Sequence, residues 1–299
     1  GDTYYYAEEV KKELLKEFFI ELTEDVFNEC LDYLEENNDV VRVEKRIYLK
    51  SYYEKEINIA RNLKKIDSKA PKMFYNIDEK LKELEEKLKI NYNETQEKAI
   101  KGALNNNITI ISGGPGTGKT TIINAIVKLY IEKEKLGSAD IMETIALLAP
   151  TGRAAKKMNS STGIPAYTIH RYLKWYKDSN EFVYNEFNKT HHKLIIVDEV
   201  SMIDVDLFNA LLNGINSNIK LILVGDTFQL PSVGPGLVLN ELIESDYFNY
   251  IPLNQIYRQS DNSYIPFLAK EIKNNDLSEE FLTKKDDYNF VKVDSSNIK

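Results

Sequence analysis

The fold is decided by the stretch Gly113-Gly114-Pro115-Gly116-Thr117-Gly118-Lys119-Thr120. It matches in full the phosphate-binding pattern G-x-x-x-x-G-K-[ST], in which backbone N–H groups surround phosphate oxygens and the lysine adds a positive charge. A strand-like run, Ile108–Ile111, leads into the stretch, and a helical segment, Thr121–Tyr130, follows it. We therefore predict a strand–loop–helix unit that binds the phosphates of a nucleotide.

Around this loop, from about residue 91 onward, short β-branched runs alternate with helical segments. The runs are Asn107–Ser112, Thr144–Ala149, Lys193–Val197 and Lys220–Val224. Alternation of this kind is typical of a parallel sheet that is covered by helices on both faces. The predicted fold class is therefore α/β.

Two adjacent acids, Asp198 and Glu199, end the third of these runs. Downstream of a phosphate-binding loop, Asp198 is expected to hold Mg²⁺ together with the hydroxyl of Thr120, and Glu199 to orient and deprotonate a water molecule. Taken alone, such a pair could equally be ordinary loop acids or helix caps. In combination with the loop it predicts a site that hydrolyses ATP with Mg²⁺.

The N-terminal region is instead dense in Glu, Lys and Tyr. Apolar residues at helical spacing predict a first helix from Ala7 to Phe18, and Thr23 is expected to cap a second over Glu24–Glu36. Two short strands, Val40–Val43 and Arg46–Leu49, and a helix over Tyr53–Ile66 are predicted to follow. This order would suit a small winged-helix-like module that touches DNA, and a helical scaffold is the alternative.

The segment Pro150–Lys177 forms a local basic stripe in a chain whose net charge is −8. It contains no Asp or Glu, and its basic residues are Arg153, Lys156, Lys157, Arg171, Lys174 and Lys177. They are interleaved with the aromatic residues Tyr167, His170, Tyr172, Trp175 and Tyr176. Cations that meet phosphates and rings that stack on unpaired bases predict binding of single-stranded DNA. The alternative is that the aromatic residues fill the core and the basic ones solvate helices.

Composition excludes several other classes of protein. Hydrophobic residues make up 42% of the 299 residues and charged residues 29%, which is the balance of a soluble chain with a sizeable core rather than of a disordered one. No apolar run is long enough to span a membrane. The single cysteine cannot form an internal disulfide, which favours a reducing compartment. We therefore expect a cytoplasmic protein without membrane contact.

The cysteine and the paired histidines are both expected to be structural. Cys30 is predicted to be a small side chain that the helix over residues 24–36 turns inward. His191 and His192 look like a metal-binding pair, but neighbours in an extended chain point to opposite sides. We interpret them as loop residues.

The acid pair begins a longer segment, Asp198–Asp204, that resembles motif II of superfamily 1 helicases, in their RecD/TraA branch. Segments that resemble other motifs of this family follow the family's order: motif Ia at 149–155, a DNA-contact segment at 168–173, motif III at 223–234 and motif IV at 253–259. The resemblance covers about residues 91 to 260 and points to the α subunit of exodeoxyribonuclease V or to stand-alone RecD-like helicases. It implies a RecA-like P-loop domain.

The resemblance also implies roles for single residues. Gln96 would hold the adenine edge, although Asn93 and Gln96 could instead form a helix capping box. Gln229 would sense the γ-phosphate, or be an ordinary loop glutamine. Tyr257 would stack on the base and Arg258 would stabilise charge on the transferred phosphoryl group, whereas an isolated Tyr-Arg pair would be a surface feature.

These residues complete the expected sites. The expected catalytic residues are Lys119, Glu199, Gln229 and Arg258. The expected nucleotide-binding residues are Gln96, Gly113, Gly114, Pro115, Gly116, Thr117, Gly118, Lys119, Thr120, Thr121 and Tyr257. The expected DNA contacts are Thr151, Arg153, Lys156, Lys157, Thr168, His170, Arg171 and Trp175.

Three regions are predicted: an N-terminal helical or winged-helix-like domain at 1–75, the first RecA-like ATPase domain at 76–250, and the incomplete start of a second at 251–299. Motifs V and VI of the family are not in the sequence, so we expect a fragment of a longer helicase. The predicted function is an ATP-dependent DNA helicase or translocase, 5′ to 3′ by resemblance, that acts on single-stranded DNA in repair or recombination, with other exodeoxyribonuclease V subunits as candidate partners. The alternative is a nucleotide-switched DNA-binding or interaction subunit without motor activity.

Overall fold

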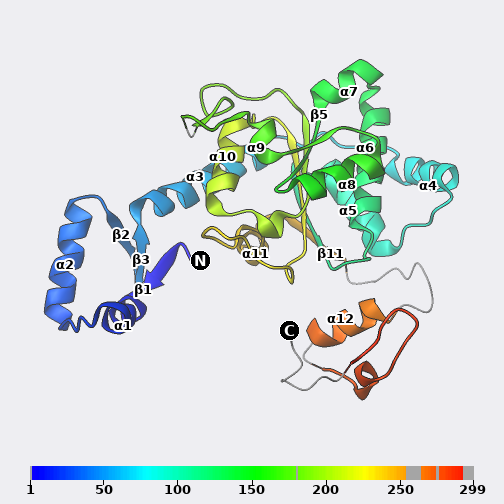
Figure 1. Ribbon diagram of the computed structural model, residues 1–299. Coiled ribbons are helices and arrows are strands. Elements are labelled where there is room, and N and C mark those ends of the chain that lie inside the picture. The colour runs from blue at the N-terminus through cyan, green and yellow to red at the C-terminus, as the bar shows by residue number, and fades with distance from the viewer. Residues whose placement is uncertain (1, 180, 254–263, 274–275, 292–299) are drawn as a thin grey trace.

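The structure is a computed structural model that describes residues 2–179, 181–253, 264–273 and 276–291. At its centre is a six-stranded sheet in the order β11-β4-β10-β9-β5-β6 (Figure 1). The strands are β4 (Ile108–Gly113), β5 (Ile145–Ala149), β6 (Ala166–Thr168), β9 (Leu194–Val197), β10 (Lys220–Gly225) and β11 (Asn249–Leu253). Every neighbouring pair is parallel. The predicted α/β class is thus confirmed, and the carboxyl ends of the strands share one edge of the sheet.

Helices cover both faces of this sheet. They are α4 (Ile77–Leu88), α5 (Glu94–Asn105), α6 (Lys119–Glu134), α7 (Ser138–Thr144), α8 (Gly152–Thr162), α9 (Ile169–Tyr172), α10 (Val205–Gly214) and α11 (Val238–Glu244). Alternate residues of one strand enter different cores: Leu194 and Ile196 join the core under α4, α5, α6 and α8, while Ile195 and Val197 join the core under α10 and α11. Burial on both faces explains why the strands read as continuous apolar runs. Among the described residues, none of the helices is long and apolar enough to cross a membrane.

The N-terminal region forms a separate small sheet with two helices. Strands β1 (Tyr4–Tyr6), β3 (Arg46–Leu49) and β2 (Val40–Val43) are antiparallel in that order, beside α1 (Ala7–Phe18) and α2 (Glu24–Glu36). Both helices and the hairpin agree with the prediction, and the Thr23 hydroxyl accepts a hydrogen bond from Val26 N at the start of α2. Strand β1 was not expected.

The prediction that Cys30 is buried is wrong, since its side chain is exposed. Helix α2 packs on the small sheet along one side, and the residues it buries are Phe27 and Leu31. The buried stripe of α2 thus consists of one residue in each helical turn. Cys30 lies just beside it and therefore faces solvent.

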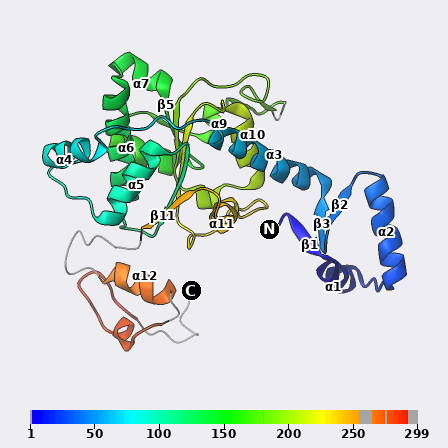
Figure 2. The ribbon, with the colours of Figure 1, turned by 180° about the vertical axis from the view of Figure 1, so that it is seen from behind.

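Helix α3 (Lys50–Asp67) joins the N-terminal region to the sheet (Figure 2). It packs along α10, where Asn58 Nδ2 donates to Asn209 Oδ1 at 2.7 Å and to Asn213 Oδ1 at 2.8 Å. Apolar residues of α3, among them Leu63 and Ile66, pack into the core that lies under α10 and α11. The domain limits at residues 75 and 250 stay a prediction. Because α3 and β11 both pack with the central sheet, we propose limits near residue 50 and after residue 253.

Replacing Ile66 by alanine should lower the free energy of unfolding of the sheet domain by about 2–5 kcal/mol, because Ile66 is 2% exposed and its loss leaves a cavity. Ile57→Ala, on the solvent side of the same helix with 43% exposure, is the matched control and should cost much less. Urea denaturation followed by circular dichroism measures both. Equal losses would mean that α3 is not part of this core.

Candidate functional site

The phosphate-binding loop joins the carboxyl end of β4 to the first turn of α6. Lys119 Nζ donates to the carbonyl oxygens of Gly113 at 2.6 Å and Gly114 at 3.2 Å, and the Thr117 hydroxyl donates to Gly114 O at 2.9 Å. The partners of the ammonium group are thus uncharged oxygens of the loop itself. Among the described residues, no carboxylate stands within ion-pair distance of it. The positive charge therefore remains available to an anion that enters the loop.

Gln96 supports this loop from α5 and is 3% exposed. Gln96 N donates to Asn93 Oδ1 at 2.8 Å and Asn93 N donates to Gln96 Oε1 at 3.2 Å, which is the capping box considered above. Gln96 Nε2 also donates to Thr117 O at 3.0 Å. Gly118, whose φ is 88°, fits against this amide because a Cβ there would lie 2.4 Å from Nε2. The geometry supports the capping alternative, and adenine contact by Gln96 stays a prediction.

The acid pair stands at the same edge of the sheet, at the end of β9. Asp198 is 7% exposed and accepts a hydrogen bond from Glu199 N at 2.9 Å. Burial raises the pKa of Asp198, the Glu199 carboxylate raises it further, and the nearby Lys119 and Lys157 ammonium groups lower it. Glu199 takes a left-handed backbone, with φ of 57°, and its buried Oε2 has no hydrogen-bond partner among the residues that the structure describes. A buried carboxylate oxygen of this kind calls for a functional explanation, and it directly follows Asp198 at the end of β9.

A third acid, Asp226, was missed as a site residue. It follows β10, which lies between β4 and β9 in the sheet, and it is 3% exposed. A Cβ on Gly114 would stand 4.0 Å from Asp226 Oδ2, so this carboxylate faces the phosphate-binding loop. Its Oδ1 accepts a hydrogen bond from Phe228 N at 3.0 Å and shapes the turn that carries Gln229. An acid directly after a buried parallel strand was the signal that could have found it.

The residues at this edge fit a Mg²⁺–nucleotide complex. Thr120 lies in the first turn of α6, and Asp198 ends a strand two places away from β4 in the sheet. A hydroxyl and one carboxylate are hard oxygen ligands, and Mg²⁺ in such sites takes its other ligands from phosphates and water. Among the described residues, no three His, Cys, Asp or Glu side chains are grouped to hold a metal ion by themselves.

The basic residues expected to contact DNA divide into two groups. Arg153, Lys156 and Lys157 are exposed on α8, which follows β5 at the carboxyl edge of the sheet. Lys157 is also close enough to Asp198 to lower the pKa of that carboxyl. Arg171 instead lies over the ring of Tyr167, with its guanidinium carbon 5.2 Å from the ring centre. DNA contact by all four stays a prediction.

The other expected DNA-contact residues have structural partners. Thr151 and Thr168 cap α8 and α9, where their hydroxyls accept from Ala154 N and Arg171 N at 3.3 Å. His170 and Trp175 pack against each other and against Phe182, which holds together the short hairpin of β7 (Trp175–Tyr176) and β8 (Glu181–Phe182). Trp175 is 36% exposed and can still offer a face to a base.

The histidine pair lies in the loop before β9, as expected. The ring of His192 is held between the Tyr172 hydroxyl, 3.0 Å from Nδ1, and the Met142 carbonyl oxygen, 3.2 Å from Nε2. Burial lowers the pKa of His192, so its neutral form is favoured. His191 is exposed. His191 and His192 both line a cavity beside α9 (Ile169–Tyr172).

Comparison with known proteins identifies the region around this site. A family profile described as "AAA domain" matches residues 96–235. RecBCD enzyme subunit RecD of Mycolicibacterium smegmatis is 37% identical over 168 residues, which is 50% of this chain and 30% of that protein. The ATP-dependent RecD2 DNA helicase of Deinococcus radiodurans is 39% identical over 153 residues, 51% of this chain and 20% of that protein. Over this region the chain is similar to RecD-like helicases.

Two further known proteins are similar to a larger part of this chain. RecBCD enzyme subunit RecD of Haemophilus influenzae is 32% identical over 225 residues, or 66% of this chain and 34% of that protein. The chain thus spans about a third or less of the length of these relatives. The solved structure of Pif1 helicase from Candida albicans is similar over 64% of this chain and 46% of that one, with 21% identity and a TM-score of 0.48.

Of the further RecD-like site residues, Gln229 is half-buried on the turn that Asp226 shapes, at the end of β10 beside β4. Tyr257 and Arg258 lie outside the described residues. The roles of all three in nucleotide binding or hydrolysis stay predictions.

Replacing Asp198 by asparagine should raise the free energy of unfolding at about pH 8 without Mg²⁺, because burial and Glu199 disfavour the charged carboxylate in the folded state. The raised pKa means that this penalty builds up as the pH rises above the ordinary aspartate value of about 4. The gain should therefore vanish in acid. Thermal denaturation across pH checks this, with the exposed Asp39→Asn as control. A less stable Asp198→Asn protein at about pH 8 would contradict the electrostatic account.

Proposed function

We propose that the chain carries the ATPase part of an ATP-dependent DNA helicase or translocase. One observation carries this proposal: Lys119, Asp198 and Glu199 come together at the carboxyl edge of one parallel sheet, with the charge of Lys119 lowering the pKa of Asp198. A cation in a phosphate-binding loop and two acids opposite it are what phosphoryl transfer to water needs. The similarity of this region to RecD-like helicases supports the assignment to DNA helicases.

The hydrolytic step follows from the groups at this edge. The Lys119 ammonium leaves the carbonyls of Gly113 and Gly114 and donates to the β and γ phosphates. Thr120 and Asp198 would hold Mg²⁺, which neutralises phosphate charge when it is bound. Glu199 accepts a proton from water through its unpartnered Oε2, so that the water oxygen attacks the γ-phosphorus and ADP leaves. Gln229 reports the presence of the γ-phosphate to the rest of the protein.

The wider role is proposed from the relatives and from the basic stripe. The substrate is single-stranded DNA, the movement is 5′ to 3′, and the process is DNA repair or recombination in the cytoplasm. Two of the relatives are named as RecBCD subunits, which supports other exodeoxyribonuclease V subunits as partners. The third is named as an ATP-dependent DNA helicase, which supports motor activity.

Lys119→Ala should abolish ATP hydrolysis through loss of phosphate binding, and Glu199→Gln should lower kcat by about 10²–10⁴ while ATP still binds. Release of phosphate with and without single-stranded DNA measures turnover, and a fluorescent ATP analogue measures binding. Lys128→Ala on the same helix and the exposed Glu181→Gln are matched controls. Undiminished turnover in either site variant would contradict the role proposed for the residue that it replaces. Binding without DNA-stimulated turnover in the unchanged chain would favour the nucleotide-switched alternative.

Charge reversal of Arg153, Lys156 and Lys157 together should weaken binding of single-stranded DNA and flatten its dependence on salt. Each phosphate contact that is lost should reduce the slope of log K against log salt by about 0.7. Fluorescence anisotropy with a labelled oligo-dT at several salt concentrations measures this slope. Reversal of three exposed lysines outside the stripe, Lys12, Lys82 and Lys87, is the control. An unchanged slope in the stripe variant would contradict the proposal that α8 binds single-stranded DNA.

A further inference from the structure

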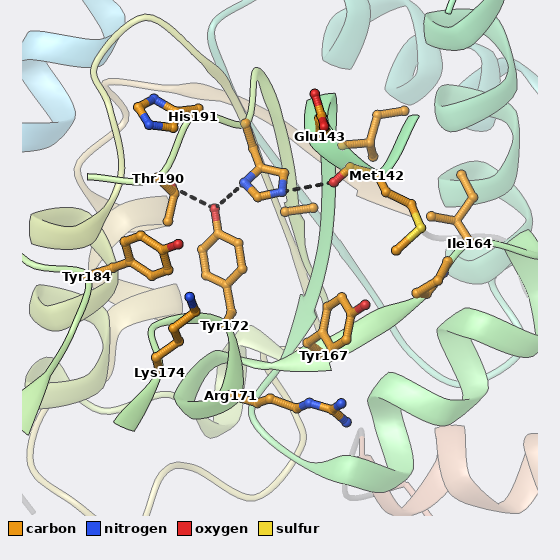
Figure 3. A pocket seen from close by; sticks show the side chains of 14 residues that line it. Met142, Glu143, Ile164, Tyr167, Arg171, Tyr172, Lys174, Tyr184, Thr190 and His191 are labelled. Atoms are coloured by element: carbon orange, nitrogen blue, oxygen red, sulfur yellow. Dashed lines mark hydrogen bonds between the residues drawn. The ribbon is translucent and has the colours of Figure 1, made fainter. Parts of the chain in front are cut away.

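A cavity of about 560 Å³ lies beside α9, apart from the phosphate-binding loop (Figure 3). Its floor includes Ile145, the first residue of β5, and part of its wall is Thr190–His192, just before β9. These residues mark the amino end of the sheet, whereas the phosphate-binding loop follows the carboxyl end of β4. The volume falls in the range of sites for small ligands, which is about 300–1,000 Å³. A ligand here would therefore be distinct from the hydrolysed nucleotide.

The walls of the cavity combine aromatic rings with two cations and one carboxylate. Tyr167, Tyr172 and Tyr184 line it, together with Arg171, Lys174 and Glu143. The Arg171 guanidinium lies 5.2 Å from the centre of the Tyr167 ring, and Lys174 Nζ lies 5.0 Å from that of Tyr184. In the part of the chain that the structure describes, neither cation is paired with a carboxylate. Their charges are therefore free to meet an anion.

The polar groups on one side of the cavity are hydrogen-bonded to other groups of the protein. The Tyr172 hydroxyl lies 2.8 Å from Thr190 Oγ1 and 3.0 Å from His192 Nδ1, and His192 Nε2 lies 3.2 Å from Met142 O. This network fixes the wall without placing a charge in it. Figure 3 shows Arg171 at the end of the cavity opposite to His191. The cavity is thus mainly apolar and aromatic inside, with its two cations toward one end and the Glu143 carboxylate away from Arg171.

We propose that this cavity takes one nucleobase of single-stranded DNA, stacked against the tyrosine rings, with the adjoining phosphate on Arg171 and Lys174. The proposal rests on the proposed DNA-binding function and adds a defined base site to it. A nucleobase offers the flat apolar face that aromatic rings bind, and its phosphate offers the anion that the two cations lack. Arg171 and Lys174 belong to the same basic segment of the sequence as Arg153, Lys156 and Lys157.

The test measures binding of an oligo-dT that carries a single 2-aminopurine, whose fluorescence falls when it stacks on an aromatic ring. Tyr167→Ala should weaken binding about five-fold or more and remove the fluorescence change, because one stacking contact is lost. Tyr167→Phe keeps the ring and should restore both. Arg171→Gln should weaken binding and reduce its salt dependence. Tyr33→Ala and Arg61→Gln, exposed residues on α2 and α3, are the matched controls and should leave both readings unchanged.

The outcomes separate the two proposals. If the unchanged protein does not bind the oligonucleotide at all, the proposed DNA function fails and the base site fails with it. If the unchanged protein binds but Tyr167→Ala binds and quenches equally well, the base site alone is overturned. Cross-links from a 5-iodouracil oligonucleotide to Tyr167, Tyr172 or Tyr184 support the base site, and cross-links confined to α8 overturn it. In a Lys119→Ala background, displacement of those cross-links by equimolar dTMP would show a free nucleotide as occupant and also overturn it.

Discussion

The site depends on one electrostatic constraint, which is that the ammonium groups of Lys119 and Lys157 stand near several carboxylates at the edge of an otherwise apolar sheet. Asp198 and Asp226 are buried there, and Glu199 keeps an unpartnered oxygen. Burial and the Glu199 carboxylate raise the pKa of Asp198, whereas the hydrogen bond from Glu199 N and the charges of Lys119 and Lys157 lower it. An arrangement that costs stability in the free protein is suited to bind a cation and a polyphosphate.

The parallel sheet makes this concentration of charge possible. Strand β10 lies between β4 and β9, so the loop with Lys119 and the acids after β9 and β10 all emerge at one edge. The strands themselves are buried on both faces, which fixes the edge rigidly. The opposite end of the same sheet is free of this chemistry. There the described residues leave an aromatic cavity whose lining includes Arg171 and Lys174 of the basic stripe as well as Glu143, so the two ends can serve different ligands.

Patterns of periodicity and spacing predicted β4, β5, β9 and β10, the N-terminal hairpin and the helices α1, α2 and α3, because each depends on local sequence. They did not predict the short strand β1 or the two edge strands of the central sheet, β6 and β11. Contacts that depend on packing could not be predicted. Cys30 is exposed because α2 buries a narrow stripe, and Thr151 and Thr168 also cap helices, while their contact with DNA stays a prediction. Gln96 was left between two roles, and the capping box with its added bond to Thr117 O is the one seen. Asp226 became a site residue only when β10 was placed beside β4.

The central claim is that three separate segments form one site for Mg²⁺ and ATP. Hydrogen–deuterium exchange of the chain with and without Mg²⁺ and a slowly hydrolysed ATP analogue tests it most directly. The account predicts joint protection of residues 113–121, 198–202 and 226–229, which depends on both Mg²⁺ and the analogue. Protection of the loop alone, or of none of the three, would contradict it.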